Sequence, residues 1–170
     1  MICCAGVWSP SLVRLAGLEL HVAAEARYVF FTEPGDSLPE RLPFTVDFST
    51  GFYFHREGNQ LLLGGRMATV EELADTAIRR LPLLSEVGVM GGWHGDYEMS
   101  PDHNAIVGRA RCPEGLLYAT GFSGHGFQQS PVIGQVLAEL ALGKDPSFDL
   151  TPFSAERFAA QSRRPEANVI

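Results

Sequence analysis

The residues best suited to chemistry lie in a glycine-rich segment late in the chain, Gly121–Gly126 (GFSGHG). The segment follows an apolar run that predicts a strand, Leu116–Thr120, and precedes a predicted helix. Glycines let backbone N–H groups approach a ligand closely, and a helix N-terminus favours negative charge. The spacing matches neither G-x-G-x-x-G nor the phosphate-binding P-loop. The pattern therefore predicts a ligand-binding turn, with a ligand-free βα turn as the alternative.

Ser123 within this turn raises a second possibility, a serine hydrolase. A nucleophile elbow needs a glycine two residues after the serine, and His125 occupies that position. Its bulk argues against the strained elbow.

The remaining polar residues suggest no metal centre. The histidines show no metal-binding spacing; they are His21, His55, His94, His103 and His125. Asp102-His103 follows Ser100-Pro101 and is expected to form a turn in which Asp102 accepts backbone N–H bonds.

The elements that must position these residues indicate an α/β chain. Apolar and β-branched runs predict strands at 2–5, 27–32, 44–48, 52–55 and 61–63, a hairpin turn at 57–59 and an extended segment at 87–99. The middle of the chain should therefore form an antiparallel sheet.

Three helices are expected around this sheet. Ser9 and Pro10 would start a short helix over 11–16 that ends at Gly17. Thr69 and Glu72 form a capping-box pattern before helical periodicity that closes at Pro82. Ser130 and Pro131 would start a largely buried helix over 132–142, and the irregular tail allows a turn near 155–160.

Composition restricts the class of protein. The 170 residues are 45% hydrophobic and 19% charged, with a net charge of −7 and no Lys/Arg cluster, so no nucleic-acid partner is expected. No apolar run approaches the roughly 20 residues of a membrane span, and no signal peptide is evident. Cys3, Cys4 and Cys112 form no CxxC motif, and the first two are expected to be buried thiols. We expect a cytoplasmic protein.

Four segments occur in a characteristic order: Ala5–Ser9 (AGVWS), Phe48–Tyr53 (FSTGFY), Gly92–Asp102 (GWHGDYEMSPD) and Gly121–Gln128 (GFSGHGFQ). Together they resemble the carboxy-terminal half of the D-amino-acid oxidase-type FAD superfamily, in the branch of sarcosine oxidase β-subunit, glycine oxidase and dimethylglycine dehydrogenase. The resemblance runs from about the first residue to Phe158.

The resemblance implies a set of cofactor-contacting residues. FAD would be bound without a covalent link, because no cysteine lies in Gly95–Tyr97, where some relatives attach it. The predicted FAD contacts are Ala5, Gly6, Trp8, Gly95, Gly121, Phe122, Ser123, Gly124, His125, Gly126, Phe127 and Gln128. Tyr53 and Arg66 are the predicted residues on the substrate side.

Two departures from related enzymes bear on substrate and electron acceptor. Monomeric sarcosine oxidase-like enzymes carry a lysine near the flavin on the strand that matches Leu61–Gly64, where this chain has leucines, which favours a dehydrogenase or a slow oxidase. Gln128 stands where those enzymes have a carboxylate-binding lysine, and an amide supplies a hydrogen bond without the charge.

The resemblance also implies a domain order. Residues 1–24 would end an FAD-binding domain, 25–99 would form the antiparallel substrate domain, 100–145 would return to the FAD-binding domain, and 146–170 would be an irregular tail. The expected activity is oxidation of a small amine or N-methylated amino acid by hydride transfer to flavin.

The family's G-x-G-x-x-G dinucleotide fingerprint is absent from the sequence. The missing amino-terminal FAD-binding half, or another subunit, is therefore an expected partner. The alternative is a catalytically inactive fragment or subunit that packs against a separate FAD-binding chain.

Overall fold

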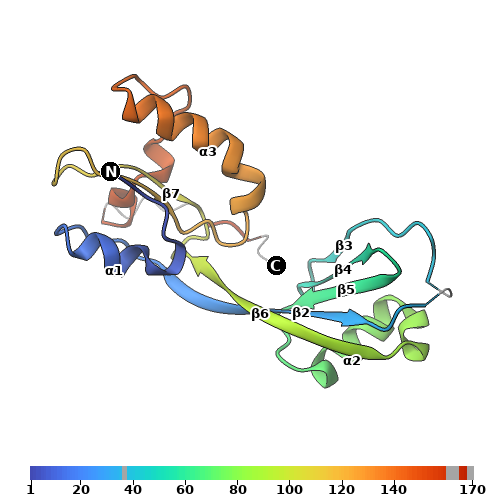
Figure 1. Ribbon diagram of the computed structural model, residues 1–170. Coiled ribbons are helices and arrows are strands. Elements are labelled where there is room, and N and C mark those ends of the chain that lie inside the picture. Colours follow the sequence, from blue (N-terminus) through green and yellow to red (C-terminus); the bar gives the residue numbers. More distant parts are fainter. Residues whose placement is uncertain (36–37, 160–164, 168–170) are drawn as a thin grey trace. The chain divides into compact units, whose positions relative to one another are not determined.

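The computed structural model describes residues 1–35, 38–159 and 165–167, which form two compact units. Unit 1 combines Met1–Glu25 with the chain from Tyr97 onward, and unit 2 is Ala26–Asp96. Unit 1 therefore combines the amino-terminal segment with a segment from the second half of the sequence, drawn in blue and in yellow to red in Figure 1. None of the described helices is long and apolar enough to cross a membrane.

Unit 1 is built on a small mixed sheet. Its strand order is β1 (Ile2–Cys3), β8 (Leu117–Thr120) and β7 (Ile106–Arg109), with β1 parallel and β7 antiparallel to β8. Every residue of β8 is buried, because one face of the sheet packs with α1 (Ser9–Arg14) and the other with α3 (Gly126–Ala141). Burial on both faces explains why this strand is a continuous apolar run.

Short 3₁₀ segments complete unit 1. The segment η1 (Gly6–Trp8) leads from β1 into α1, and η3 (Thr151–Phe153) and η4 (Ala155–Phe158) form the tail. The turn predicted at 155–160 corresponds to η4, and Ala160 lies outside the described residues.

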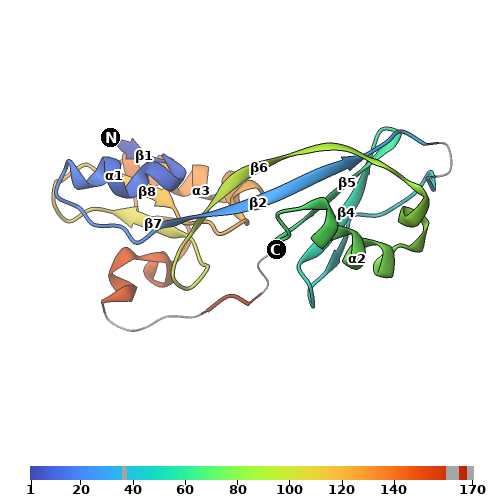
Figure 2. The same cartoon turned by 90° about the horizontal axis from the view of Figure 1, so that it is seen from below.

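Unit 2 is a five-stranded sheet with a helical layer on one face. Its order is β3 (Thr45–Asp47), β4 (Phe52–Glu57), β5 (Gln60–Gly65), β2 (Ala23–Thr32) and β6 (Val89–Met99), and the β3–β4, β4–β5 and β5–β2 pairs are antiparallel. Helix α2 (Val70–Arg80) and η2 (Pro82–Glu86) lie along one face (Figure 2). The core there contains Phe52, Phe54, Leu61, Leu63, Leu73, Ala77 and Leu84.

Helix α2 begins as the capping pattern predicts. The Thr69 hydroxyl accepts the Glu72 N–H at 3.2 Å, and the Glu72 carboxylate accepts the Ala68 N–H at 3.0 Å. The reciprocal bond therefore reaches one residue further back than in the ideal capping box.

Helix α3 corrects two predictions. It begins at Gly126, before the predicted start, so that Pro131 lies inside it. Because Pro131 has no N–H to donate to the Phe127 carbonyl, the Ser130 hydroxyl donates to that carbonyl instead, at 2.8 Å. The expectation of extensive burial was also wrong: the buried residues of α3 are Val136, Leu137 and Leu140.

The start of the chain corrects two further details. Ser9 is the first residue of α1 and is buried, so it is not the N-cap of a later helix. Cys3 is buried as expected, but Cys4 follows the short strand and is exposed. Neighbouring residues of an extended chain point to opposite sides, which explains why only one thiol is buried.

Candidate functional site

The glycine-rich turn of unit 1 connects β8 to α3 through a left-handed backbone. Gly121, Ser123 and Gly124 have φ values of +68°, +53° and +90°. A Cβ atom on Gly124 would lie 2.7 Å from Cε2 of Tyr97, and one on Gly121 would lie 3.1 Å from Cβ of Ser100. Backbone conformation and close packing therefore both require glycine at these two positions.

Glu98 holds the start of this turn. Its carboxylate oxygen Oε2 accepts the Thr120 hydroxyl at 2.6 Å and the Gly121 N–H at 2.9 Å. Its backbone carbonyl accepts the Ser123 N–H at 3.1 Å. Glu98 lies within the Gly92–Asp102 segment, but nothing in the spacing of that segment predicts that its side chain reaches the turn.

The same contacts bring a second predicted segment to the turn. The Thr120 hydroxyl oxygen lies 3.1 Å from the Gly6 carbonyl, and a Cβ on Gly6 would lie 3.8 Å from Oε2 of Glu98. The structure thus places the Ala5–Trp8 segment and the start of the glycine turn together around Glu98. Trp8 at the end of that segment is 73% exposed.

Ser123 has a structural position in the turn. Its side chain is fully buried; its hydroxyl donates to the Gly121 carbonyl and accepts the Ser100 N–H, both at 3.1 Å. A hydrolytic nucleophile must reach its substrate, which this hydroxyl does not, so the geometry gives the hydrolase alternative no support.

The turn ends at the exposed N-terminus of α3. Among the described residues, the N–H groups of Gly126, Phe127 and Gln128 have no acceptor, and the first bond runs from Gln129 N–H to the His125 carbonyl at 3.2 Å. The Phe127 side chain is 93% exposed. An apolar ring beside open N–H donors suits a flat ligand with electron-rich edges.

The predicted substrate-side residues lie on unit 2. Tyr53 pairs with Gly64, and a Cβ on Gly64 would lie 2.1 Å from Cζ of Tyr53, so the tyrosine ring lies across the glycine. The Phe44 ring lies 5.6 Å from the Tyr53 ring and 5.7 Å from the His55 ring. These rings form an aromatic face on the side of the sheet opposite α2, because Tyr53 and His55 alternate with core residues of β4.

Arg66 lies at the same end of the β4–β5 hairpin as Tyr53. Its Cγ and Nε atoms lie 3.8 Å from the position of a Cβ on Gly51, two residues before Tyr53. The structure therefore brings the two predicted substrate-side residues to one end of the hairpin. A Cβ on Gly95, a predicted cofactor contact on β6, would have nothing within 4 Å.

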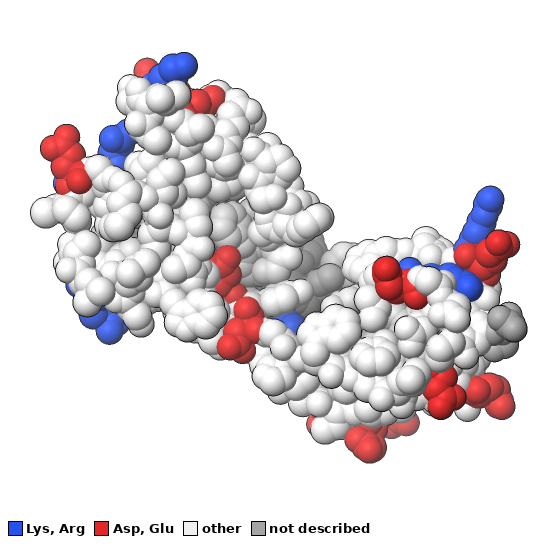
Figure 3. Space-filling view, in the orientation of Figure 1, with Lys and Arg blue, Asp and Glu red and all other residues white. Residues whose placement is uncertain are grey.

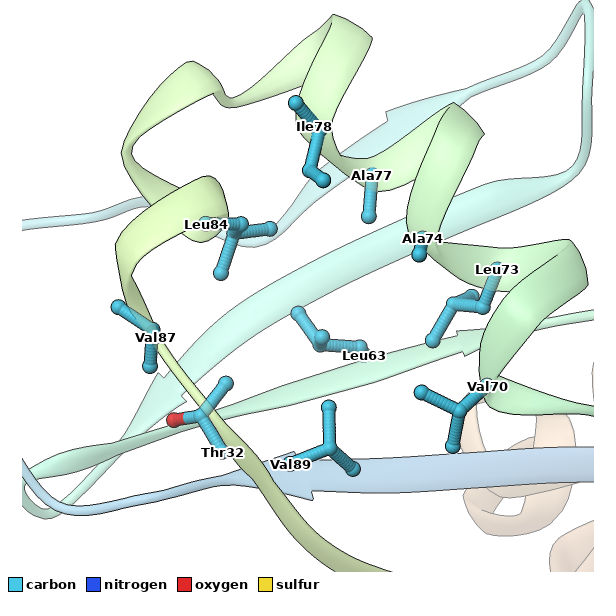
Figure 4. A pocket seen from close by; sticks show the side chains of 10 residues that line it. All are labelled: Thr32, Leu63, Val70, Leu73, Ala74, Ala77, Ile78, Leu84, Val87 and Val89. Atoms are coloured by element: carbon cyan, nitrogen blue, oxygen red, sulfur yellow. The ribbon is translucent and has the colours of Figure 1, made fainter.

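Unit 2 also contains an apolar cavity of about 360 Å³ between α2 and the sheet (Figure 4). Its one hydroxyl group belongs to Thr32, which donates to the Glu33 carbonyl and accepts the Leu61 N–H, both at 3.0 Å. The lining thus offers no free polar group to orient a charged substrate, and we place the candidate site elsewhere.

Charged groups do not define a further site. On the face shown in Figure 3, Lys and Arg side chains are scattered and do not form a patch. No group of three or more potential metal ligands occurs among the described residues.

Comparison with curated proteins gives relatives that are named as oxidoreductases or oxidases. The chain is 30% identical to FAD-dependent oxidoreductase domain-containing protein 1 of Xenopus laevis, over 98% of this chain and 39% of that protein. It is 36% identical to N-methyl-L-tryptophan oxidase of Salmonella heidelberg, over 91% of this chain and 46% of that enzyme. The chain therefore spans less than half the length of these relatives.

Solved structures share the fold. L-proline dehydrogenase from P. horikoshii matches with a TM-score of 0.82 at 23% identity, over 96% of this chain and 48% of that one. Glycine oxidase from Geobacillus kaustophilus matches with a TM-score of 0.81 at 25% identity, over 92% of this chain and 45% of that one.

The family model described as FAD dependent oxidoreductase matches residues 1–140, which include the Ala5–Trp8 segment, the glycine-rich turn and the strands of both sheets. This chain belongs to the FAD-dependent oxidoreductase family, as the resemblance predicted, and the cofactor of the family is FAD.

Proposed function

We propose that this chain is the carboxy-terminal part of an enzyme that oxidises a small amine or N-methylated amino acid with FAD. The observation that carries the proposal is the convergence of Gly6 and Gly121 on Glu98, which joins the two segments that resemble flavin-contacting loops. Bound FAD would accept a hydride from the carbon next to the substrate nitrogen, and the resulting imine would be hydrolysed.

Unit 1 would provide the FAD-binding surface. The open N–H groups of Gly126, Phe127 and Gln128 would face electron-rich atoms of the cofactor, and the helix N-terminus would favour negative charge on its reduced form. The exposed side chains of Trp8 and Phe127 would be covered by the cofactor or by protein around it. The predicted contacts of Ala5, Phe122, His125 and Gly95 remain part of this proposal.

Unit 2 would provide the substrate surface. Tyr53 and Phe44 present aromatic rings, and Arg66 at the end of the same hairpin would attract a substrate carboxylate. N-methyl-L-tryptophan oxidase among the relatives supports an amino-acid substrate of this kind.

Unit 1 also exposes an apolar surface that further protein would cover. Ile2, Leu12 and Leu15 are 46%, 44% and 87% exposed, and within the described part of the chain β1 has one strand neighbour, β8. Such a surface fits a further FAD-binding segment, of the same or another polypeptide. The alternative function, an inactive subunit that packs on an FAD-binding chain, rests on the same surface.

Flavin retention tests the proposal. The chain would be desalted with FAD, alone and mixed with the amino-terminal half of the Salmonella N-methyl-L-tryptophan oxidase, and retained flavin read by absorbance. We expect retention at least in the mixture, followed by turnover of N-methylated amino acids. Flavin binding without turnover would favour the inactive subunit, and the absence of flavin from both samples would contradict the proposal.

A pair of exposed phenylalanines provides a matched control. Phe127→Ala should weaken FAD binding by about tenfold without changing the melting temperature, because the ring is 93% exposed and supports no core. Phe148→Ala, at a side chain that is 50% exposed elsewhere in unit 1, should change neither quantity. Equal effects of both substitutions would argue against a flavin contact at Phe127.

A further inference from the structure

A buried ion pair connects the carboxy-terminal tail to the turn before β7. Arg157 Nε and Nη2 donate to Asp102 Oδ2 and Oδ1, each at 2.8 Å, and the two side chains are 3% and 1% exposed. Arg157 Nη2 also donates to the Asn104 carbonyl at 2.9 Å, and Nη1 donates to the Ser154 carbonyl at 3.1 Å. The guanidinium therefore joins η4 to residues 102–104 with planar, bidentate geometry.

The turn held by Arg157 continues directly to the glycine turn. The Ser100 hydroxyl donates to the Asn104 carbonyl at 2.7 Å, and the Ser100 N–H donates to the buried Ser123 hydroxyl at 3.1 Å. Ser123 in turn donates to the Gly121 carbonyl at 3.1 Å and has a left-handed φ of +53°. One continuous hydrogen-bond network thus runs from the tail to the predicted FAD-binding loop.

A second tail contact reaches the same turn. The Glu166 N–H donates to the Asp102 carbonyl at 3.0 Å, and Nδ1 of His103 lies 3.0 Å from the Glu166 carbonyl. Both Arg157 and Glu166 lie beyond residue 140, where the match to the family model ends. The tail therefore contacts the site region through residues that the family match does not include.

We propose that Arg157 and Asp102 act as a positioning pair that holds the glycine turn in its left-handed conformation through Ser100 and Ser123. A buried ion pair is weak evidence for stability, and its better-attested contribution is to select one conformation. The tail would then determine how much of the population has the turn ready for its ligand. The identity of that ligand as FAD rests on the proposed function.

Amide hydrogen exchange of the complete chain tests the positioning role. Arg157→Met should accelerate exchange of the Gly121, Ser123 and His125 amides by roughly tenfold more than exchange of the β8 amides, because the turn would open locally. Equal acceleration in both segments would show general destabilisation and would overturn the proposal. If Arg157→Met does not fold, the neutral double variant Asp102→Asn/Arg157→Gln provides the same comparison.

The exposed pair of Arg111 and Glu156 is the matched control. It joins the same η4 segment, at 2.6 and 2.8 Å, but the two side chains are 84% and 55% exposed. Arg111→Gln should leave the ratio of exchange rates unchanged, and a change as large as that of Arg157→Met would contradict a specific role.

A double-mutant cycle with Ser123→Ala tests the route. If Arg157 acts through Ser100 and Ser123, adding Arg157→Met to Ser123→Ala should accelerate exchange of the turn much less than it does in the wild-type background. Full additivity would overturn the route. The exchange measurement needs no FAD, so a failure of flavin binding would count against the proposed function and leave this result intact.

Discussion

The glycine turn of unit 1 and the aromatic face of unit 2 are held in place by different forces. In the turn, the Glu98 carboxylate and the Ser123 hydroxyl make hydrogen bonds of 2.9–3.1 Å to backbone groups, and Gly121 and Ser123 are buried. On the aromatic face, the Tyr53 ring lies against Gly64 and near the Phe44 ring, and Phe44 is 57% exposed.

Under the proposed function, this difference would suit the two regions to different roles. A directional hydrogen-bond network fixes a backbone within narrow limits, which suits a cofactor that stays the same. Contacts between exposed rings tolerate changes in size, which suits a surface that must fit different substrates.

The largest expected loss of stability comes from adding a side chain at Gly92, where the sheet of unit 2 has no room for one. A Cβ on Gly92 would lie 2.6 Å from the Val29 carbonyl oxygen, which belongs to the neighbouring backbone and cannot move aside. Gly92→Ala should lower the free energy of unfolding by about 3 kcal/mol, measured by urea denaturation. Gly95→Ala on the same strand, with open space around it, should cost nothing measurable, and an equal loss there would refute the steric explanation.

Removal of the Glu98 carboxylate should affect the glycine turn next most strongly. Glu98→Ala leaves the Gly121 N–H without its acceptor, and we expect a loss of about 2 kcal/mol in unfolding free energy. Glu114→Ala, at an exposed position of the same unit, is the control and should be neutral. Loss of flavin affinity with unchanged stability would place Glu98 in the ligand contact itself.

Acid should act on unit 1 through Asp102. Burial alone would raise the pKa of Asp102, but hydrogen bonds from Arg157 and the Asn104 N–H outweigh it and hold the pKa below its ordinary value. A carboxyl whose pKa is lowered by folding stabilises the protein above its ordinary pKa and loses that contribution as pH falls through the lowered one. The free energy of unfolding should therefore fall below about pH 4. We expect this fall to be smaller than the loss of unfolding free energy caused by Glu98→Ala at neutral pH.

The variant Asp102→Asn, which does not titrate, isolates the contribution of the Asp102 carboxyl to the pH dependence of stability. Urea denaturation at several pH values should show a smaller acid-dependent decline for the variant than for the wild type. Asp47 in unit 2 also has a lowered pKa, owing to hydrogen bonds from the Ser49 hydroxyl and N–H, but its decline is common to both proteins. Identical pH profiles would show that Asp102 does not contribute.

The smallest effect is expected on the aromatic face. Gly64→Ala would displace the Tyr53 ring, which can rotate away, so we expect a cost of about 1 kcal/mol or less. The near-ultraviolet circular dichroism should change, because the contact between Phe44 and Tyr53 is altered. An unchanged spectrum would show that the ring is not seated on Gly64.

The sequence predicted elements well where periodicity and turn residues agree. The capping residues Thr69 and Glu72 located the start of α2, and Gly58-Asn59 located the β4–β5 hairpin. Local patterns succeed in these cases because the interactions that decide them lie within a few residues.

The expectations that failed or were missing have two causes, one local and one long-range. The start of α3 was predicted too late because Pro131 normally marks a first turn, whereas Ser130 serves the carbonyl that the proline cannot. The contacts of Glu98 with Gly121, and of Arg157 with Asp102, join residues that are far apart in the sequence. No single-sequence pattern encodes such pairs, so the network around the predicted site became visible only in the structure.

The proline inside α3 also separates an exposed first turn from the packed remainder of the helix. The Ser130 hydroxyl replaces one backbone donor of the helix. The buried residues Val136, Leu137 and Leu140 all follow Pro131. The first turn, which presents Phe127, therefore has one backbone hydrogen bond fewer to the part of the helix that is packed on the sheet. We expect it to behave as a hinged flap that can tilt toward an incoming ligand while the rest of the helix stays fixed on the sheet.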